Sequence, residues 1–278
     1  MKADPHVTRG LGRFVFITGG CEMRYEVLGN LRISDGDEVA VLRARKIEPL
    51  LATLLIRSGQ VVSASHLITE IWGDEPPRRA TATLHVYISQ LRKFLTTPGD
   101  TRSPIVTRAP GYVLQLGEST LDVHEFQQLV REGRGHAKAR RHADASRAFS
   151  AALALWRGDV LGDLHGGPTI ESFTTWAEEA RLECTEMLFE ADLAQGAHRE
   201  LVARLYQITL EHPLRETFHR LLMLALYRSG RTGEALMAYE SVRAKLDTEL
   251  GITPCRALNE LRQAILLSDP ALDHAIAA

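Results

Sequence analysis

The stretch of sequence that decides the fold is PPRRATATLHVYISQLRKFL, residues 76–95. Its apolar residues recur at the spacing of an α-helix, which places them on one buried face. Four residues form this face: Leu84, Ile88, Leu91 and Leu95. On the opposite face, no Asp or Glu stands between Arg78 and Lys93. Because a solvated helix usually carries charges of both signs, this acid-free face favours an anionic partner.

The start of this helix carries two arginines, Arg78 and Arg79, although the helix dipole disfavours positive charge at an N-terminus. We expect the two prolines of the stretch to pre-set the first turn and Asp74 or Glu75 to cap it. If the two arginines and the helix N-terminus bound a phosphate together, the positive charges would become favourable at this position.

The acid-free face suits the major groove of DNA because its small residues permit close approach. Gln90 can form two hydrogen bonds to an adenine edge, and Val86 can contact a thymine methyl group. Six further residues can position the helix on phosphates: Arg78, Arg79, Thr83, Tyr87, Arg92 and Lys93. The alternative is a helix whose polar stripe only faces water.

The flanking segments predict a helix-turn-helix followed by a hairpin, as in a winged helix. SASHLITEIWG, residues 63–73, predicts a short helix that Ser63 or Ser65 can cap and Gly73 can end. PIVTR and GYVLQL predict two strands joined by a tight turn at residues 109–111. This hairpin would be the wing.

Two residues beside the helix extend the predicted DNA surface. Trp72 ends the short helix, where its indole N–H can reach a phosphate, although a place in the core is equally consistent with its type. Arg108 lies near the hairpin tip and can enter the minor groove. The alternative for Arg108 is an exposed residue at a strand end.

The N-terminal part predicts a small sheet and one more helix. Residues 24–41 contain short strand patterns separated by turn residues. RARKIEPLLATLLIRSG, residues 43–59, predicts a helix that either starts near Pro49 or kinks there. Residues 1–22 show no clear period and predict a loose extension, and whether it belongs to the native protein stays open.

From Asp122 onward, consecutive helical patterns replace the strands. Seven helices are predicted: 123–139, 142–157, 171–195, 198–212, 215–229, 232–249 and 254–267. Gly196 and Gly230 are 34 residues apart, the period of tetratricopeptide repeats, and residues 140–149 align with the segment that ends at Tyr239. Stacked helix pairs leave a groove, so this half predicts a module for protein contacts. A plain helical bundle is the alternative.

The charge of the chain is unevenly distributed around a net value of −2. Residues 23–116 hold 12 Lys and Arg against 9 Asp and Glu, whereas residues 117–278 hold 18 against 24. Within residues 78–108 there are six basic residues and one acidic residue. A local basic surface beside an acidic domain is typical of a nucleic-acid-binding protein, and random fluctuation is the alternative.

Composition and motifs weigh against several other classes. Apolar residues make up 45% and charged residues 24%, as in an ordinary globular protein. Three cysteines in no pairable pattern predict a reducing, cytosolic compartment, and no apolar run is long enough for a membrane span. Motifs such as G-x-S-x-G, H-E-x-x-H, C-x-x-C and a phosphate loop are missing, so we expect no catalytic residue, metal or cofactor and do not expect an enzyme.

Two long segments resemble known families. LITEIWGDEPPRRATATLHVYISQLRKFL and IVTRAPGYVL resemble the winged helix of OmpR/PhoB-type response-regulator effectors, with Trp-Gly after the second helix, LRK in the third and Gly-Tyr closing the wing. WRGDVLGDL and the segment from HPLRETFHRLL to LNELRQAIL resemble the bacterial transcriptional activation domain. Over residues 23–268 the chain therefore resembles the SARP family, antibiotic regulatory proteins that activate biosynthetic gene clusters.

This resemblance implies a mainly α fold with a small β component. A winged helix-turn-helix domain is expected over residues 23–116, after an extension at 1–22. An all-α, tetratricopeptide-like activation domain is expected over residues 122–270, before a tail at 271–278.

The resemblance also implies a function. SARP proteins are similar in binding promoter direct repeats head to tail and recruiting RNA polymerase holoenzyme, which implies a homodimer at least on DNA and a location in the cytoplasm with the nucleoid. Base reading is assigned to Val86 and Gln90 and minor-groove contact to Arg108. Phosphate contacts are assigned to Trp72, Thr83, Tyr87 and Arg92. Related regulators often have arginine where this chain has Gln90, so base preference does not transfer.

Two other functions remain open at this point. A tetratricopeptide-like scaffold for a protein or small ligand could use its winged helix only for protein contacts. A repressor could use the same DNA contacts as an activator.

Overall fold

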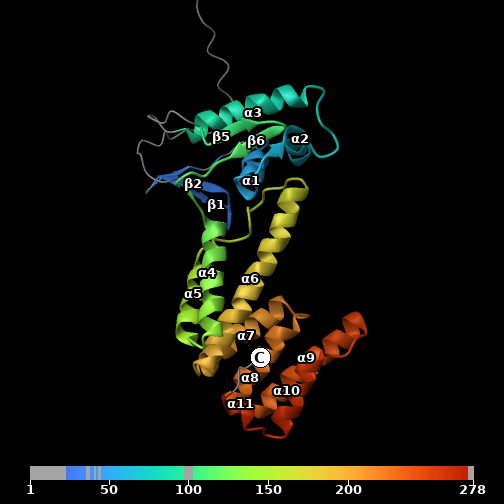
Figure 1. The fold of residues 1–278 in the computed structure, drawn as a ribbon. Helices are drawn as coiled ribbons and strands as arrows, with labels where there is room; N and C mark the ends of the chain where they lie inside the picture. The colour runs from blue at the N-terminus through green and yellow to red at the C-terminus, as the bar shows by residue number, and fades with distance from the viewer. Residues whose placement is uncertain (1–22, 36–37, 41, 43–44, 97–102, 275–278) are drawn as a thin grey trace, which may run out of the picture. The chain divides into compact units, whose positions relative to one another are not determined.

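The computed structural model describes residues 23–35, 38–40, 42, 45–96 and 103–274, and the remaining residues, Cys21 among them, lie outside the described part (Figure 1). The chain forms two compact units. The first comprises Met1–Gln128 and Ala154–Ala180, and the second comprises Leu129–Leu153 and Arg181–Ala278. Each unit is described by itself.

The first unit begins with a small sheet of short strands. Its strands are β1 (Arg24–Glu26), β2 (Arg32–Asp35), β3 (Glu38–Ala40) and β7 (Thr120–Leu121), in the spatial order β3-β2-β1-β7. β1 pairs antiparallel with β2 and parallel with β7. Within the predicted region, strands are confirmed at residues 24–26, 32–35 and 38–40, and residues 36, 37 and 41 lie outside the described part. β7 was not predicted, because two residues are too few to show a period.

Three helices follow, α1 (Glu48–Ile56), α2 (Ala64–Trp72) and α3 (Ala80–Leu95). Pro49 lies in the first turn of α1, so the helix starts there and has no kink at the proline. Ser63 caps α2, because its Oγ accepts the backbone N–H of His66 at 3.2 Å. Gly73 ends α2 with φ at +62°, as predicted.

The wing belongs to a second sheet, with strands β4 (Val62–Ser63), β5 (Ile105–Arg108) and β6 (Gly111–Leu114) in the order β4-β6-β5. β5 and β6 form the predicted antiparallel hairpin, with Arg108 opposite Gly111. A Cβ at position 111 would lie 1.9 Å from the carbonyl oxygen of Val62. Glycine is therefore required where β4 passes the end of the wing.

Two segments beyond the predicted winged helix belong to the same unit. Asp122 begins α4 (Asp122–Lys138) with its side chain only 1% exposed. Its carboxylate accepts the backbone N–H groups of Val27 and Leu28 at 2.9 Å. Arg157 contacts the same carboxylate at 3.4 Å, and its backbone N–H donates to the carbonyl of Leu28 at 2.8 Å. Residues 154–180 therefore complete the first unit.

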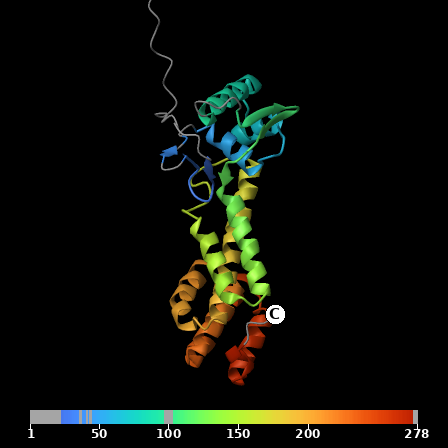
Figure 2. The ribbon, with the colours of Figure 1, turned by 60° about the vertical axis from the view of Figure 1, so that its left-hand side comes forward.

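The second unit is built from helices alone among its described residues. They belong to α4, α5 (His142–Ala154), α6 (Pro168–Ala194), α7 (His198–Glu211), α8 (Glu216–Arg228), α9 (Thr232–Leu250), α10 (Arg256–Leu266) and α11 (Ala271–His274). All seven predicted helices are present, with α6 starting three residues before its predicted start. The four-residue α11 was not predicted. Figures 1 and 2 both show α4 and α5 side by side.

The helical repeat is visible in the turns between helices. Gly196 and Gly230 adopt positive φ angles, and in each turn the next residue donates its N–H to a carbonyl five residues earlier. Arg140 adopts φ of +56° in a turn of the same type. Arg140 aligns with Gly230 in the predicted repeat, and the buried Phe149 aligns with the buried Tyr239. These equivalences support the repeat inferred from the sequence.

Candidate nucleic-acid interface

The two faces of α3 differ as the sequence predicts. The four residues of the apolar face are at most 1% exposed: Leu84, Ile88, Leu91 and Leu95. On the other face Val86 is 53% exposed, although it is apolar, and Gln90 is half-buried. An exposed apolar residue beside an amide is a suitable pair for base edges, which present methyl groups as well as polar atoms.

The start of α3 differs from the prediction. The helix begins at Ala80, whose N–H donates to the carbonyl of Pro77 at 2.9 Å, so the prolines lie in a turn before the helix. Asp74 and Glu75 provide no cap, and the N-cap residue is Arg79 without a side-chain cap bond. The prediction of a proline-initiated and acid-capped first turn is therefore wrong. Because no acid lies in the first turn, no carboxylate there competes for a phosphate.

The predicted phosphate contacts surround α3. Three are exposed: Arg78, Arg79 and Lys93. Four are half-buried: Trp72, Thr83, Tyr87 and Arg92. The rings of Trp72 and Tyr87 stack at 5.9 Å between centroids and 18° between planes. Trp72 is therefore neither a core residue nor a free surface residue, since it packs α2 against α3 along one side of its ring.

Arg92 has a structural role that the sequence did not reveal. Its Nε donates to the carbonyl of Ile105 at 2.9 Å, and its Nη2 donates to Oγ1 of Thr107 at 2.8 Å. The guanidinium also lies 6.0 Å from the ring of Tyr112. Arg92 therefore fastens the wing to α3, and its predicted phosphate contact would have to use the N–H groups that remain. Arg108 is exposed at the end of β5, where the wing turns.

The opposite side of α2 is held by buried polar contacts. The Glu70 side chain is fully buried, and its Oε1 accepts the backbone N–H of Thr169 at 2.7 Å, in the first turn of α6. His66 Nε2 lies 2.7 Å from Oγ1 of Thr169 and 3.2 Å from Oε1 of Glu70. A carboxylate at a helix N-terminus is favourable because it meets free N–H groups. A sequence pattern could not reveal this contact, because its partners are about 100 residues apart.

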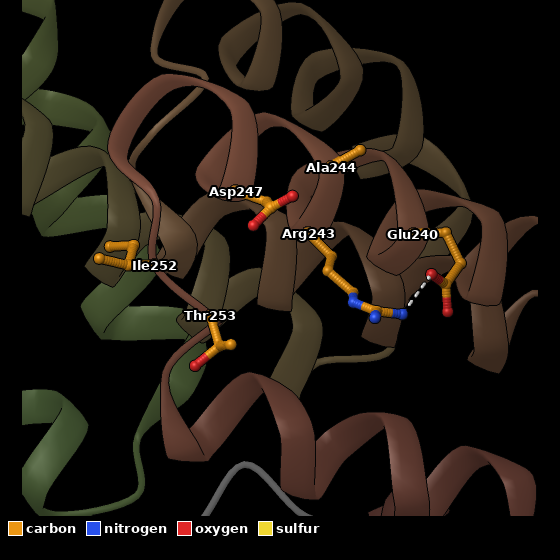
Figure 3. A pocket seen from close by; sticks show the side chains of 6 residues that line it. All are labelled: Glu240, Arg243, Ala244, Asp247, Ile252 and Thr253. Atoms are coloured by element: carbon orange, nitrogen blue, oxygen red, sulfur yellow. Dashed lines mark hydrogen bonds and ion pairs between the residues drawn. The ribbon is translucent and has the colours of Figure 1, made fainter.

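Apart from the face of α3, the described residues offer little that resembles a binding site for a small ligand or a metal. A hollow of about 310 Å³ lies on α9 and the following loop (Figure 3). There Arg243 lies between Glu240 and Asp247 and is 3.2 Å from the Glu240 carboxylate. The described residues contain no group of three or more His, Cys, Asp or Glu that could bind a metal. No helix among them is long and apolar enough to cross a membrane.

The two arginines beside the turn before α9, Arg228 and Arg231, form contacts within the fold. Arg231 forms two hydrogen bonds with Glu234, at 2.7 and 2.5 Å, and Arg228 donates to the backbone carbonyls of Leu193 and Leu272. Gly230 has φ at +76°, as a turn after a helix requires.

Comparison with known families supports both halves of the fold. A family model described as bacterial transcriptional activator domain matches residues 121–266. A second, described as transcriptional regulatory protein, C terminal, matches residues 39–114.

Several regulators are similar over most of this chain. Regulatory protein AfsR of Streptomyces griseus is 38% identical over 250 residues, which are 90% of this chain and 25% of AfsR. Regulatory protein DnrI of Streptomyces peucetius is 36% identical over 258 residues, which are 91% of this chain and 95% of DnrI. The chain thus spans about a quarter of the length of AfsR and almost all of DnrI.

A solved structure of Mycobacterium tuberculosis EmbR, in complex with a low affinity phosphopeptide, has the same fold. It is 34% identical, with a TM-score of 0.85, over 90% of this chain and 66% of that chain. A winged helix joined to a helical activator domain identifies a bacterial transcriptional regulator. The chain belongs to the SARP family of transcriptional regulators, which confirms the resemblance found in its sequence.

Proposed function

We propose that the protein is a sequence-specific DNA-binding activator that binds direct repeats in promoters and recruits RNA polymerase holoenzyme. The exposed, acid-free face of α3 supports this proposal most strongly. Phosphate contacts fix the register of a protein on DNA, whereas contacts to base edges provide specificity. This face supplies residues for both tasks, since basic groups surround Val86 and Gln90.

In this proposal, α3 enters the major groove. Val86 and Gln90 read base edges, and Arg78 and Arg79 bind a phosphate at the helix N-terminus. Thr83, Tyr87, Lys93 and Trp72 contact neighbouring phosphates. Arg92 contributes mainly by holding the wing, whose Arg108 enters the minor groove.

The SARP family supports an assignment to promoters of secondary-metabolite gene clusters, and we propose this as the regulated pathway class. The protein would act in the cytoplasm with the nucleoid, as a pair of copies at least on DNA. Residues 23–116 would form the DNA-binding domain and residues 122–270 the activation domain, with the first unit of the fold extending into the latter.

A reconstituted transcription assay tests this function. Purified holoenzyme is supplied with a template whose upstream repeats come from mapping the bound DNA genome-wide. We expect transcript to increase with the protein and to stay at the basal level when the repeats are scrambled. A decrease would identify a repressor, and the absence of both transcription change and DNA binding would support the scaffold alternative.

A further inference from the structure

The exposed face of α3 carries a second pair of polar residues beside the pair Val86 and Gln90. His85 and Ser89 are both exposed on this helix. They are four residues apart, as Val86 and Gln90 are, so the members of each pair are neighbours along the helix, with about 5–6 Å between their Cβ atoms. Neither His85 nor Ser89 was among the predicted DNA contacts. We call His85 and Ser89 the second row.

The two pairs lie on either side of the middle of the exposed face. At about 100° per residue, Lys93 points almost directly away from the buried apolar face. Ser89 and His85 follow on one side of Lys93, at about 40° and about 80° from it. Val86 and Gln90 follow on the other side, at about 20° and about 60°. The face that can meet a ligand is therefore broader than Val86 and Gln90 alone.

Neighbouring elements explain why the second row is the more open of the two. Gln90 lies on the side of the helix where Tyr87 stacks with Trp72 of α2, and its side chain is half-buried. The second row lies on the side of Arg92, which donates hydrogen bonds to two residues of β5 in the wing. A base contact from the second row would therefore lie on the wing side of the contacts made by Val86 and Gln90.

The hydrogen-bonding groups of the second row are available to a ligand. Within the described ranges of the chain, the His85 imidazole and the Ser89 hydroxyl form no hydrogen bond or ion pair with another residue. Two threonine hydroxyls of the same segment differ, because Thr83 donates to the carbonyl of Arg79 at 3.1 Å and Thr96 donates to the carbonyl of Arg92 at 2.7 Å. The fold uses those hydroxyls and leaves the second row unused.

The chemistry of the imidazole favours a purine. A neutral imidazole has one N–H donor, and N7 of both guanine and adenine is an acceptor in the major groove. Ser89 is small enough to let the helix approach the base edges beside this contact. We propose that His85 is a third base-reading residue, which donates to N7 of a purine on the wing side of the bases read by Val86 and Gln90. The inference rests on the proposed entry of α3 into the major groove.

The position of His85 favours a base over a phosphate. Recognition helices of helix-turn-helix proteins contact base edges mainly through their N-terminal residues, and His85 lies in the first half of α3, directly before Val86. A phosphate favours a permanent positive charge, which arginine and lysine carry. Three exposed residues supply this charge on and before the helix: Arg78, Arg79 and Lys93. Phosphate binding therefore does not require His85.

Changing one atom of the DNA at a time tests this contact. One bound repeat is prepared as a set of duplexes, and in each a single purine is replaced by its 7-deaza analogue, which lacks the N7 acceptor. Fluorescence anisotropy measures the affinity of the parent and of His85→Ala for every duplex. At one position we expect the replacement to weaken the parent about fivefold, the effect of one hydrogen bond, and to weaken His85→Ala by less than about twofold.

Two control variants make the assignment specific. Gln90→Ala should keep the sensitivity at the position assigned to His85, because the two residues contact different base pairs. If Gln90 contacts an adenine, its variant should instead lose sensitivity at another position. His124→Ala removes an exposed histidine from α4 and should behave like the parent with every duplex.

Different results would overturn the inference in different ways. If the parent is sensitive at no position, or if His85→Ala keeps every sensitivity of the parent, His85 does not donate to N7. If His85→Ala weakens all duplexes equally and makes the salt dependence shallower, His85 contacts a phosphate. In each of these cases the parent still binds the repeat, so the proposed function stands. Failure of the parent to bind any mapped repeat contradicts the proposed function itself.

Discussion

The two sides of the helix pair α2–α3 use polar residues in opposite ways. On the α3 side, the two arginines that precede the helix are exposed and Gln90 is half-buried. On the side facing the start of α6, Glu70 is completely buried and its Oε1 binds Thr169. Polar groups at a binding surface remain available for a ligand, whereas polar groups in a structural contact already form hydrogen bonds with other parts of the protein.

The same contrast separates two acidic positions. Asp122 is buried and accepts two backbone N–H groups, whereas Asp163 is exposed. Residues that look alike in the sequence therefore differ in the free energy that they contribute. Substitutions of the buried polar residues should therefore change the stability of the first unit, whereas substitutions on the exposed face of α3 should change DNA recognition.

The largest effect is expected at Asp122. Asp122→Ala leaves the N–H groups of Val27 and Leu28 without acceptors and Arg157 without its buried partner, which should reduce the free energy of unfolding by about 3 kcal/mol. Urea unfolding followed by circular dichroism measures this change. The matched control Asp163→Ala should stay within about 0.5 kcal/mol of the parent. Equal stability of the two variants would show that the contact at Asp122 is not structural.

The next effect is expected at Gln90 and concerns specificity. Gln90→Ala should reduce discrimination at one base pair by about 1–3 kcal/mol, because a bidentate contact to a base edge is lost. Binding to a set of fragments with every base at each repeat position measures it, and urea unfolding should show nearly parental stability. If discrimination falls at no position, Gln90 does not read a base.

A smaller, uniform effect is expected at Arg79. Arg79→Ala should weaken binding to all fragments similarly and make the slope of log affinity against log salt shallower by about 0.9, the contribution of one phosphate contact. Arg243→Ala, on α9, is the control and should leave the slope unchanged. A sequence-dependent loss for Arg79→Ala would instead place this residue against a base.

The smallest effect is expected at His219 in the second unit. Burial lowers the pKa of His219, whose Nε2–H donates to the carbonyl of Pro213 at 2.9 Å. Because the unfolded chain binds the proton more readily, the stability present at neutral pH falls as the pH drops through the unfolded pKa of about 6.5. His219→Gln retains a donor but does not titrate. Urea unfolding at pH 7.5 and 5.5 should therefore show a smaller loss for the variant, and equal losses would contradict this explanation.

Much of the fold could be predicted because the helical patterns of apolar residues extend over long segments of the sequence. The seven predicted helices, the cap at Ser63, the hairpin and the buried face of α3 are all present. The predicted start of α3 was wrong, because prolines are common both in the first turn of a helix and in the turn that precedes a helix. Only the hydrogen bond from Ala80 to Pro77 distinguishes the two arrangements.

The missed features share a physical cause, which is dependence on distant partners. β7 exists because it pairs with β1, about 95 residues earlier, and Arg92 holds the wing across a chain segment of 13 residues. The contact of Glu70 with Thr169 spans 99 residues. The spacing of residues within one segment cannot reveal such contacts. It does reveal the exposed face of α3, because that face is defined by the helical spacing alone.

Affinity cleavage from α3 tests the central claim, that the exposed face of this helix enters the major groove. An iron chelate is attached through Val86→Cys in a chain whose Cys21, Cys184 and Cys255 are replaced, and cleavage of a bound two-repeat fragment is mapped. We predict cuts at one fixed position within each repeat and no such cuts from a chelate attached through Arg243→Cys. Bound protein that cuts outside the repeats, or cuts equally from both attachment sites, would contradict the claim.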